Sequence, residues 1–285
     1  MRDLAITKPD RVYWPRLGLT KRWLLEWYAS IASVLIPHVA GHPVTLHRFP
    51  EGVDGPHWYQ TRAPSHPDWV RTITFRPARS GKVFDVVVLD DVESVLWAAQ
   101  IGSIELHPYL GTVDDLDHPT VAVFDLDPGA GLGTADAARA ACLVREVLDT
   151  LGVDSYAKTS GRGGMHVVIP LDRTQGYDEV KRFVRATSEL LVREHPGELT
   201  ATMSARASRA GKVLLDWSQN DPGKSTVAAY SLRAMPAPTV SMPVPWAEVA
   251  SASPLVVTAE EALARVATSG DVASTVEPQR LPTTR

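Results

Sequence analysis

The stretch Thr120-Val121-Ala122-Val123-Phe124-Asp125-Leu126-Asp127 is an apolar run that ends in two carboxylates. Its β-branched and aromatic residues predict a buried strand. Residues i and i+2 of a strand share a face at about 6.5–7 Å, so Asp125 and Asp127 converge while Leu126 points away. Because close carboxylates repel each other, the pair indicates a site for a hard divalent cation. Solvated aspartates at a plain strand end are the alternative.

A glycine-rich loop, Thr159-Ser160-Gly161-Arg162-Gly163-Gly164, separates two further predicted strands over residues 155–158 and 165–171. Its glycines let the backbone approach a phosphate, and Ser160 and Arg162 add side-chain donors. The loop is not a P-loop, because it lacks the Gly-Lys-Ser/Thr ending at the start of a helix. A glycine hairpin without a ligand is the open alternative.

A third carboxylate interrupts the apolar run Val213-Leu214-Leu215-Asp216-Trp217. A charge in an apolar strand is costly unless it is paired, so Asp216 requires a metal or a cationic partner. It would complete a three-carboxylate site with Asp125 and Asp127, and an ion pair with an arginine is the alternative. Three strand-end aspartates, a phosphate-type loop and the downstream Arg233 are the parts of two-metal nucleotidyl transfer.

The rest of the 285 residues mixes helical and strand patterns, which predicts an α/β or α+β fold. Thr20, Asp91 and Thr134 are expected to cap helices. The other expected elements are a helix over 177–193, strands over 44–49, 58–59, 72–75, 83–89 and 212–217, and a hairpin turn at 79–82.

The charge and the cysteine content of the chain indicate its compartment and its partners. The net charge of −4 gives no sign of a basic nucleic-acid-binding domain, although basic residues gather over 62–82 and 206–212. No uncharged run approaches the roughly 20 residues of a membrane span, and the single Cys142 fits a reducing compartment. We therefore expect a cytoplasmic protein without a membrane partner.

The motifs together resemble those of the archaeo-eukaryotic primase superfamily. In particular, they are similar to the bacterial polymerase domain attached to the DNA ligases of non-homologous end joining, and to its stand-alone relatives. The resemblance extends over residues 4–250 and is carried, in family order, by residues 7–15, 19–21, 48–52, 105–108, 124–128, 159–161 with His166, 215–220 and 230–234.

The resemblance implies an α/β (α+β) fold whose primase-like catalytic core has a mixed, RRM-like sheet flanked by helices. It implies one primase-polymerase domain over residues 1–270. In this domain an N-terminal module that binds DNA and its 5′-phosphate (about 1–115) packs on the catalytic core (about 116–250). The polar, proline-containing residues 271–285 favour a flexible tail.

The resemblance also assigns catalytic roles. It implies that Asp125, Asp127 and Asp216 hold two divalent cations, with Mn²⁺ preferred or Mg²⁺ in its place. One ion would activate the primer 3′-hydroxyl, and the other would hold the triphosphate and the leaving pyrophosphate. His107 matches an active-site histidine near the primer and the sugar.

Nucleotide contacts are implied for a second set of residues, which are Ser160, Gly161, Arg162, His166, Arg233 and Arg48. Ser160, His166 and Arg233 match positions that contact the phosphates of the incoming nucleotide. Gly163 stands where the family often has a lysine, and we expect Arg162 to take over that phosphate contact.

DNA contacts are implied for Arg11, Lys21, Trp58 and Tyr59. Lys21 matches a basic residue that recognises a 5′-phosphate on the downstream strand of a gap, and Arg11 stands where a lysine is usual. Trp58 and Tyr59 stand where paired aromatics face DNA and stack on a base. A pair of buried core aromatics is their alternative.

These residues predict a template-directed DNA/RNA polymerase, a primase-polymerase nucleotidyltransferase that adds NTPs or dNTPs to a primer 3′-hydroxyl. It would fill short gaps or DNA ends in DNA repair at the nucleoid. The implied partners are gapped or broken DNA with a 5′-phosphate, a DNA ligase and a Ku-type end-binding protein.

Two other function classes stay open. An Asp-x-Asp phosphohydrolase is disfavoured by Gly129, which stands where such enzymes usually have threonine or valine. A non-catalytic module that binds 5′-phosphorylated DNA ends would have no need of all three carboxylates. Nucleotide incorporation on gapped DNA separates the polymerase from both.

Overall fold

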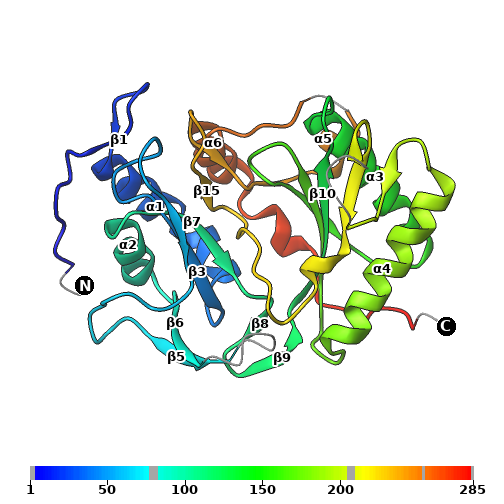
Figure 1. Cartoon of the computed structure of the whole chain (residues 1–285), viewed down its shortest axis with the longest axis horizontal. Helices are drawn as coiled ribbons and strands as arrows, with labels where there is room; N and C mark the ends of the chain where they lie inside the picture. The colour runs from blue at the N-terminus through cyan, green and yellow to red at the C-terminus, as the bar shows by residue number, and fades with distance from the viewer. Residues whose placement is uncertain (1–3, 77–82, 204–208, 252–253, 284–285) are drawn as a thin grey trace. The chain divides into compact units, whose positions relative to one another are not determined.

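The structure is a computed structural model that describes residues 4–76, 83–203, 209–251 and 254–283 (Figure 1). The expected turn at 79–82, and part of each basic group, lie outside these residues. The chain divides into two compact units. Unit 1 comprises residues 1–114, 225–241 and 257–270, and unit 2 comprises residues 115–224, 242–256 and 271–285. Two late segments, residues 225–241 and 257–270, thus belong to unit 1. The expected N-terminal module, over about 1–115, did not include them.

Unit 1 contains a five-stranded antiparallel sheet. Its strands follow the order β4 (Trp58–Gln60), β3 (Pro43–Arg48), β6 (Phe84–Val88) and β5 (Thr72–Phe75), and β7 (Ser103–Pro108) pairs with β3. The pairing of β5 with β6 confirms the two strands of the expected hairpin. β3 is thus the centre of the sheet, with β7 along one edge and both β4 and β6 along the other.

Three helices complete the core of unit 1: α1 (Lys21–Leu35), α2 (Val92–Gln100) and α6 (Ala259–Ser269). The caps expected at Thr20 and Asp91 are confirmed, since each side chain accepts a hydrogen bond from the backbone of the first turn. α1 packs against α2 and α6, and α2 against β7. The shorter elements of this unit are β1 (Val12–Trp14), β2 (Leu19–Thr20), η1 (Ile36–His38), β8 (Gly111–Thr112), β15 (Leu232–Arg233) and β16 (Thr239–Val240).

Unit 2 is built on a six-stranded mixed sheet. All neighbouring strands are antiparallel except β13 and β14, which are parallel. The strand order is β13 (Leu199–Thr200), β14 (Val213–Asp216), β10 (Val121–Pro128), β12 (Met165–Pro170), β11 (Tyr156–Thr159) and β17 (Pro243–Val244). β10, the strand predicted from the opening stretch, therefore lies inside the sheet.

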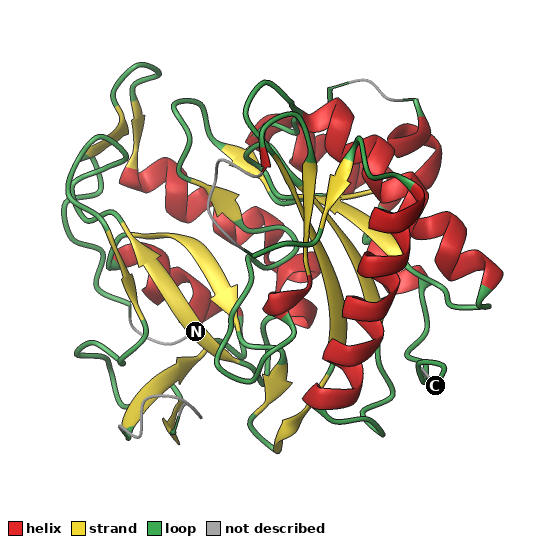
Figure 2. Cartoon of the chain, turned by 45° about the vertical axis from the view of Figure 1, so that its right-hand side comes forward, coloured by secondary structure: helices red, strands yellow, loops and turns green. Residues whose placement is uncertain are grey.

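Two long helices, α3 (Thr134–Thr150) and α4 (Tyr177–Glu194), contact each other and both pack on β10 (Figure 2). The buried face of α3 is rich in alanine, which lets this helix approach the sheet closely, whereas α4 buries larger side chains such as Tyr177 and Phe183. The cap expected at Thr134 is wrong by one residue, because Gly133 is the cap and the Thr134 hydroxyl accepts from the Leu255 amide. The remaining elements are β9 (Asp115–Pro119), η3 (Trp217–Gln219), α5 (Trp246–Ala250) and η4 (Val272–Thr275).

Residues 271–283 do not form the expected flexible tail. The Leu281 amide donates to Gln175 Oε1 over 2.7 Å, and Gln175 Nε2 donates back to the Leu281 carbonyl over 3.2 Å. The Gln279 amide donates to the Pro170 carbonyl at the end of β12. Leu281 and Ala273 are buried, so local polarity was a poor guide to this segment. Among the described residues, no helix combines the length and apolar character of a membrane crossing.

Candidate active site

The three predicted aspartates meet at one end of the unit 2 sheet. β10 lies between β12 and β14, and Asp125 stands directly opposite Asp216 in the β10–β14 register. Asp127 follows on the same face, and Leu126 points into the core. Each carboxylate offers one oxygen, and these three oxygens all lie within 4.8 Å of one another. The i, i+2 spacing and the neighbouring strand together create a dense acidic cluster.

The acidic cluster is electrostatically unfavourable as it stands. Burial, followed by the charges of Asp127 and Asp216, raises the pKa of Asp125 to about 8, against the smaller opposing effects of Lys158 and Gln219. Desolvation and the charge of Asp216 likewise raise the pKa of Asp127. Three converging oxygens that repel one another are a donor set that suits a hard divalent cation. The residues present therefore fit the metal that the resemblance implies.

Residues directly after Asp216 fix its position. Asp216 Oδ1 accepts from the Ser218 amide over 2.8 Å, and Gln219 Nε2 lies 3.3 Å from Asp125 Oδ2 and 3.4 Å from Asp216 Oδ2. The buried Asn220 side chain donates to the Val123 carbonyl over 2.7 Å and accepts from the Val123 amide over 2.9 Å. Gln219 and Asn220 belong to the motif at 215–220, but the motif alone does not predict this positioning role.

The glycine-rich loop lies beside the acidic cluster. Ser160 Oγ accepts from the amides of Arg162 and Gly164 over 3.3 and 3.0 Å, which closes a tight turn, and Gly161 has a φ of +71°. A side chain at Gly164 would collide with the Leu126 carbonyl of β10. Arg162 is exposed on the loop. The loop and the end of β10 are therefore packed backbone to backbone.

His166 comes from the strand after the loop and is the neighbour of Asp125 in the β10–β12 register. Its Nε2 lies 3.3 Å from Asp125 Oδ1, and the side chain is buried. Lys158 stands next to His166 in the β11–β12 register and is also buried. Its positive charge opposes the rise in the pKa of Asp125, a contribution that sequence analysis did not assign.

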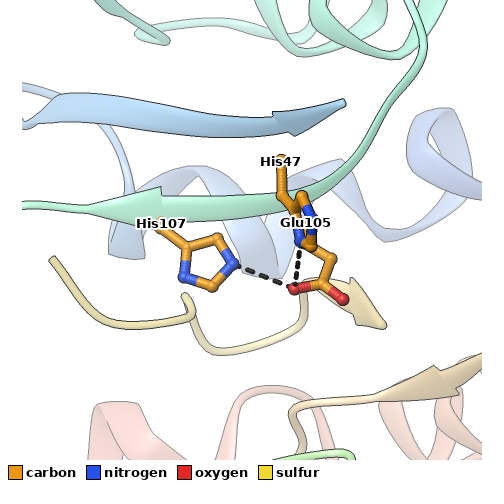
Figure 3. A group of neighbouring side chains, drawn as sticks. All are labelled: His47, Glu105 and His107. Atoms are coloured by element: carbon orange, nitrogen blue, oxygen red, sulfur yellow. Dashed lines mark hydrogen bonds and ion pairs between the residues drawn. The ribbon is translucent and has the colours of Figure 1, made fainter. Parts of the chain in front are cut away.

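His107 and Arg233 belong to unit 1, where both contact the buried Glu105. His107 Nε2 lies 3.0 Å from Glu105 Oε2, and His47 Nδ1 lies 3.2 Å from the same oxygen (Figure 3). Arg233 Nε lies 3.3 Å from the other oxygen, Oε1. Glu105 and His47 were not predicted as site residues, although the i, i+2 spacing of Glu105 and His107 places these two side chains on one face of a strand.

His47, Glu105 and His107 also lie close enough together to hold a metal ion. However, both oxygens of Glu105 already face N–H groups, since Oε1 also accepts from the Ala234 amide over 3.1 Å. The Arg233 guanidinium adds a positive charge to the same carboxylate. The charge of Glu105 is therefore compensated by the chain itself, in contrast to the acidic cluster of unit 2.

The Arg48 side chain makes its hydrogen bonds within unit 1. Its Nε and one terminal nitrogen donate to the Ile101 carbonyl over 3.1 and 2.8 Å, and its guanidinium lies 5.3 Å from the Trp58 ring centroid. The exposed fractions of Trp58 and Tyr59 are 42% and 56%, so the alternative of buried core aromatics is wrong. The Tyr59 ring stacks on His47 with centroids 4.0 Å apart.

Lys21 and Arg11 contribute to a cationic corner at the start of α1. Lys21 Nζ donates to the Thr7 carbonyl over 2.8 Å, and Arg11 donates to the Pro50 carbonyl over 2.9 Å. Burial, together with the charges of Arg11 and Lys8, lowers the pKa of Lys21 to about 8. Cations that repel one another in this way are suited to an anionic ligand.

Comparisons with known proteins agree with the site. Residues 20–273 match the family model of the LigD primase-polymerase domain. The multifunctional end-joining DNA repair protein LigD of Mycobacterium tuberculosis is 35% identical over 279 residues, which are 94% of this chain and 36% of LigD. The bifunctional LigD of Bacillus subtilis is 28% identical over 270 residues, 94% of this chain and 43% of that protein. The chain thus spans less than half the length of these relatives.

A solved structure extends the likeness to the whole fold. The polymerase domain of Mycobacterium tuberculosis ligase D in complex with DNA matches with a TM-score of 0.90 and 33% identity, covering 97% of this chain and 98% of that one. The expected α/β, primase-like fold is therefore confirmed. The chain belongs to the LigD primase-polymerase domain family, a family of nucleotidyltransferases that act in DNA repair.

Proposed function

We propose that this chain is a template-directed polymerase that adds NTPs or dNTPs to a primer 3′-hydroxyl at DNA gaps and ends during end joining. The observation that carries the proposal is the acidic cluster. Asp125, Asp127 and Asp216 converge in a family of nucleotidyltransferases, and their mutual repulsion gives the chain a reason to bind cations there.

Asp125, Asp127 and Asp216 would hold two divalent cations, with Mn²⁺ preferred over Mg²⁺. When bound, such cations increase the acidity of a hydroxyl and neutralise charge on a triphosphate. Gln219 and Asn220 keep Asp216 in place, and His166 orients Asp125. We assign Ser160, Gly161 and Arg162 to the nucleotide phosphates, because their loop lies against the end of β10.

We further assign His107, Arg233 and Arg48 of unit 1 to the sugar and phosphate groups of primer and nucleotide. His107 and Arg233 share the Glu105 carboxylate, which supports a joint role. The hydrogen bonds of Arg48 to Ile101 favour a supporting role for it, beneath Trp58.

We propose that unit 1 binds DNA, because the similar polymerase domain of known structure is in complex with DNA. Two features of unit 1 support this proposal. Arg11 and Lys21 would bind the 5′-phosphate of the downstream strand, because their crowded positive charges favour an anion. The exposed Trp58 and Tyr59 would stack on a base. A DNA ligase and a Ku-type end-binding protein remain proposed partners.

Extension of a labelled primer across a short gap with a 5′-phosphate tests the proposal. Wild type with Mn²⁺ should add template-matched nucleotides, and parallel reactions with NTPs and dNTPs would measure the sugar preference. The Asp125→Ala/Asp127→Ala variant should add none while it still binds the gap. Phosphate release from a colorimetric substrate without primer extension would favour the phosphohydrolase. Gap binding with neither activity would favour an end-binding module.

A further inference from the structure

We propose that Glu105 is a positioning residue that holds His107 in the tautomer with its proton on Nε2 and holds Arg233 by its Nε. The role rests on the proposed polymerase function, because it concerns residues assigned to primer and nucleotide. The structural basis of this role does not depend on that function, because it is the set of contacts around a single buried carboxylate.

Glu105 is 0% exposed in the middle of β7. A carboxylate in such a position requires hydrogen bonds and positive charge around it. Oε2 faces His107 Nε2 and His47 Nδ1, and Oε1 faces Arg233 Nε and the Ala234 amide. The two oxygens are therefore divided between an imidazole side and a guanidinium side.

The ionisation state of Glu105 decides which way its hydrogen bond with His107 runs. Burial alone would raise the pKa of Glu105, but the hydrogen bonds from His107 and His47 and the charge of Arg233 hold it well below its usual range. The carboxylate is thus ionised and can only accept. Burial, with the charges of Arg233 and His47, lowers the pKa of His107 despite Glu105, so that imidazole is neutral near pH 7.

A neutral imidazole carries a single N–H, and His107 must place it on Nε2 to donate to Glu105. Its Nδ1 is then a lone-pair acceptor. Figure 3 shows Nδ1 on the side of the ring away from the carboxylate. Such an atom accepts from a hydroxyl and repels a phosphate oxygen, whereas Arg233 attracts phosphate. Glu105 therefore gives its two neighbours different ligand preferences.

His47 extends the same network towards the exposed strand β4. His47 Nε2 lies 3.0 Å from His57 Nδ1, and the His47 ring stacks on Tyr59. The Tyr59 ring also meets His107 edge to face, with centroids 5.3 Å apart. The His107 ring is therefore fixed both by a hydrogen bond and by an aromatic wall.

The first test reads the tautomer directly. The protein with ¹⁵N-labelled histidine is studied near pH 7 by long-range ¹H–¹⁵N NMR, and the His107 signals are assigned from His107→Gln. We expect Nε2 protonated and Nδ1 unprotonated in wild type. A proton on Nδ1, or an imidazolium, would overturn the proposal. This readout requires neither DNA nor activity, so it stands even if the chain proves not to extend primers.

The second test uses Glu105→Gln, with the exposed Glu26→Gln of the same unit as its matched control. Glutamine keeps the size of the side chain but presents an N–H₂ group to one side, so the tautomer of His107 or the Arg233 contact must change. We expect mixed His107 tautomers and a loss of kcat/KM on the order of 10–100-fold, with Glu26→Gln unchanged. An unchanged His107 spectrum together with an unchanged kcat/KM in a folded Glu105→Gln protein would contradict the proposal.

The third test separates positioning from mere folding and from a metal site. If Glu105 acts through its neighbours, Glu105→Gln should cost much less in a His107→Ala background than in wild type. A full, additive loss would overturn the link to His107. Titration of wild type with Zn²⁺ should leave the His47 and His107 signals in place, and stoichiometric binding that Glu105→Gln abolishes would replace the positioning role with a metal site.

Discussion

Two groups of carboxylates in this chain show opposite electrostatics. The acidic cluster of unit 2 places three aspartates together, and the pKa of Asp125 rises to about 8. In unit 1, Glu105 is fully buried, yet its pKa is held well below the usual range. Burial is unfavourable for both. The difference lies in the neighbours, which are other carboxylates in the first case and N–H groups with an arginine in the second.

The two groups of carboxylates differ in what they require from a ligand. Glu105 obtains its compensation from the protein, so its geometry is complete without a ligand. The acidic cluster does not, and the folded chain keeps an excess of negative charge at the end of β10. A site of the first type orients side chains, whereas a site of the second type binds cations.

The largest expected effect comes from removing the acidic cluster. Asp125→Ala/Asp127→Ala should reduce primer extension by about 10³-fold or more, since metal-ion stabilisation is worth several kcal/mol. Its melting temperature without metal should not fall, because the substitutions remove repulsion. Gap-filling assays and thermal melts measure both, and Asp149→Asn on the exposed end of α3 is the control. A strongly destabilised double variant would contradict the view that the cluster is strained.

Glu105→Gln should have the reverse effect on stability. Although it removes a charge, it leaves Arg233 buried without its carboxylate, and we expect a loss of about 3 kcal/mol in the free energy of unfolding. Urea denaturation near pH 7 measures this loss. Because the folded pKa of Glu105 lies below its unfolded value, its contribution is present above about pH 4.3 and falls away in acid. The deficit of the variant should therefore shrink as the pH is lowered, and a deficit that grows would refute this assignment.

The third effect is a pH dependence of metal-free stability. The folded pKa of Asp125, about 8, exceeds the unfolded value, so its contribution is full below about pH 3.9 and is lost as the pH rises through 8. Mn²⁺ replaces the proton, so it should raise the melting temperature more above pH 8 than at pH 6. Asp125→Asn should flatten this difference, and an equal Mn²⁺ shift at both pH values would argue against it.

The smallest expected effect concerns the cationic corner. Lys21→Ala should reduce the preference for a 5′-phosphate over a 5′-hydroxyl at the gap by about tenfold and lower the slope of log affinity against log salt by about one. In wild type the preference should weaken as the pH rises through 8, where Lys21 loses its proton. Fluorescence anisotropy measures these affinities, with the exposed Arg193→Ala as control. A preference that survives in Lys21→Ala would place the phosphate elsewhere.

Local patterns predicted much of this molecule. The i, i+2 spacing of Asp125 and Asp127 needs only strand geometry, and the cap at Thr20 needs only one turn of helix. The motif order identified the family, and with it the primase-like fold. The three aspartates converge as proposed, because the Asp216 strand is the neighbour of β10.

Local sequence patterns did not predict contacts between distant segments of the chain. The pairing of His47 with Glu105 depends on the register of β3 against β7, which no local spacing encodes. Arg233 lies about 130 residues after Glu105 and was expected in the catalytic core, whereas it belongs to unit 1. Likewise, the polar composition of residues 271–283 hid the hydrogen bonds that hold them on unit 2.

The three segments of unit 1 are far apart in the sequence, so they are synthesised at different times. The indoles of Trp14 and Trp27 donate to the carbonyls of Met235 and Ala259, which emerge from the ribosome more than 200 residues later. An N-terminal fragment of about 114 residues would thus lack β15, α6 and the arginine that faces Glu105. Unit 1 can be completed only after its last segment, residues 257–270, has been synthesised, and most of unit 2 is translated before that segment. Contacts between segments so far apart in the sequence also form slowly. We therefore expect the N-terminal segment to be the part most exposed to misfolding during synthesis, and the last to become protected.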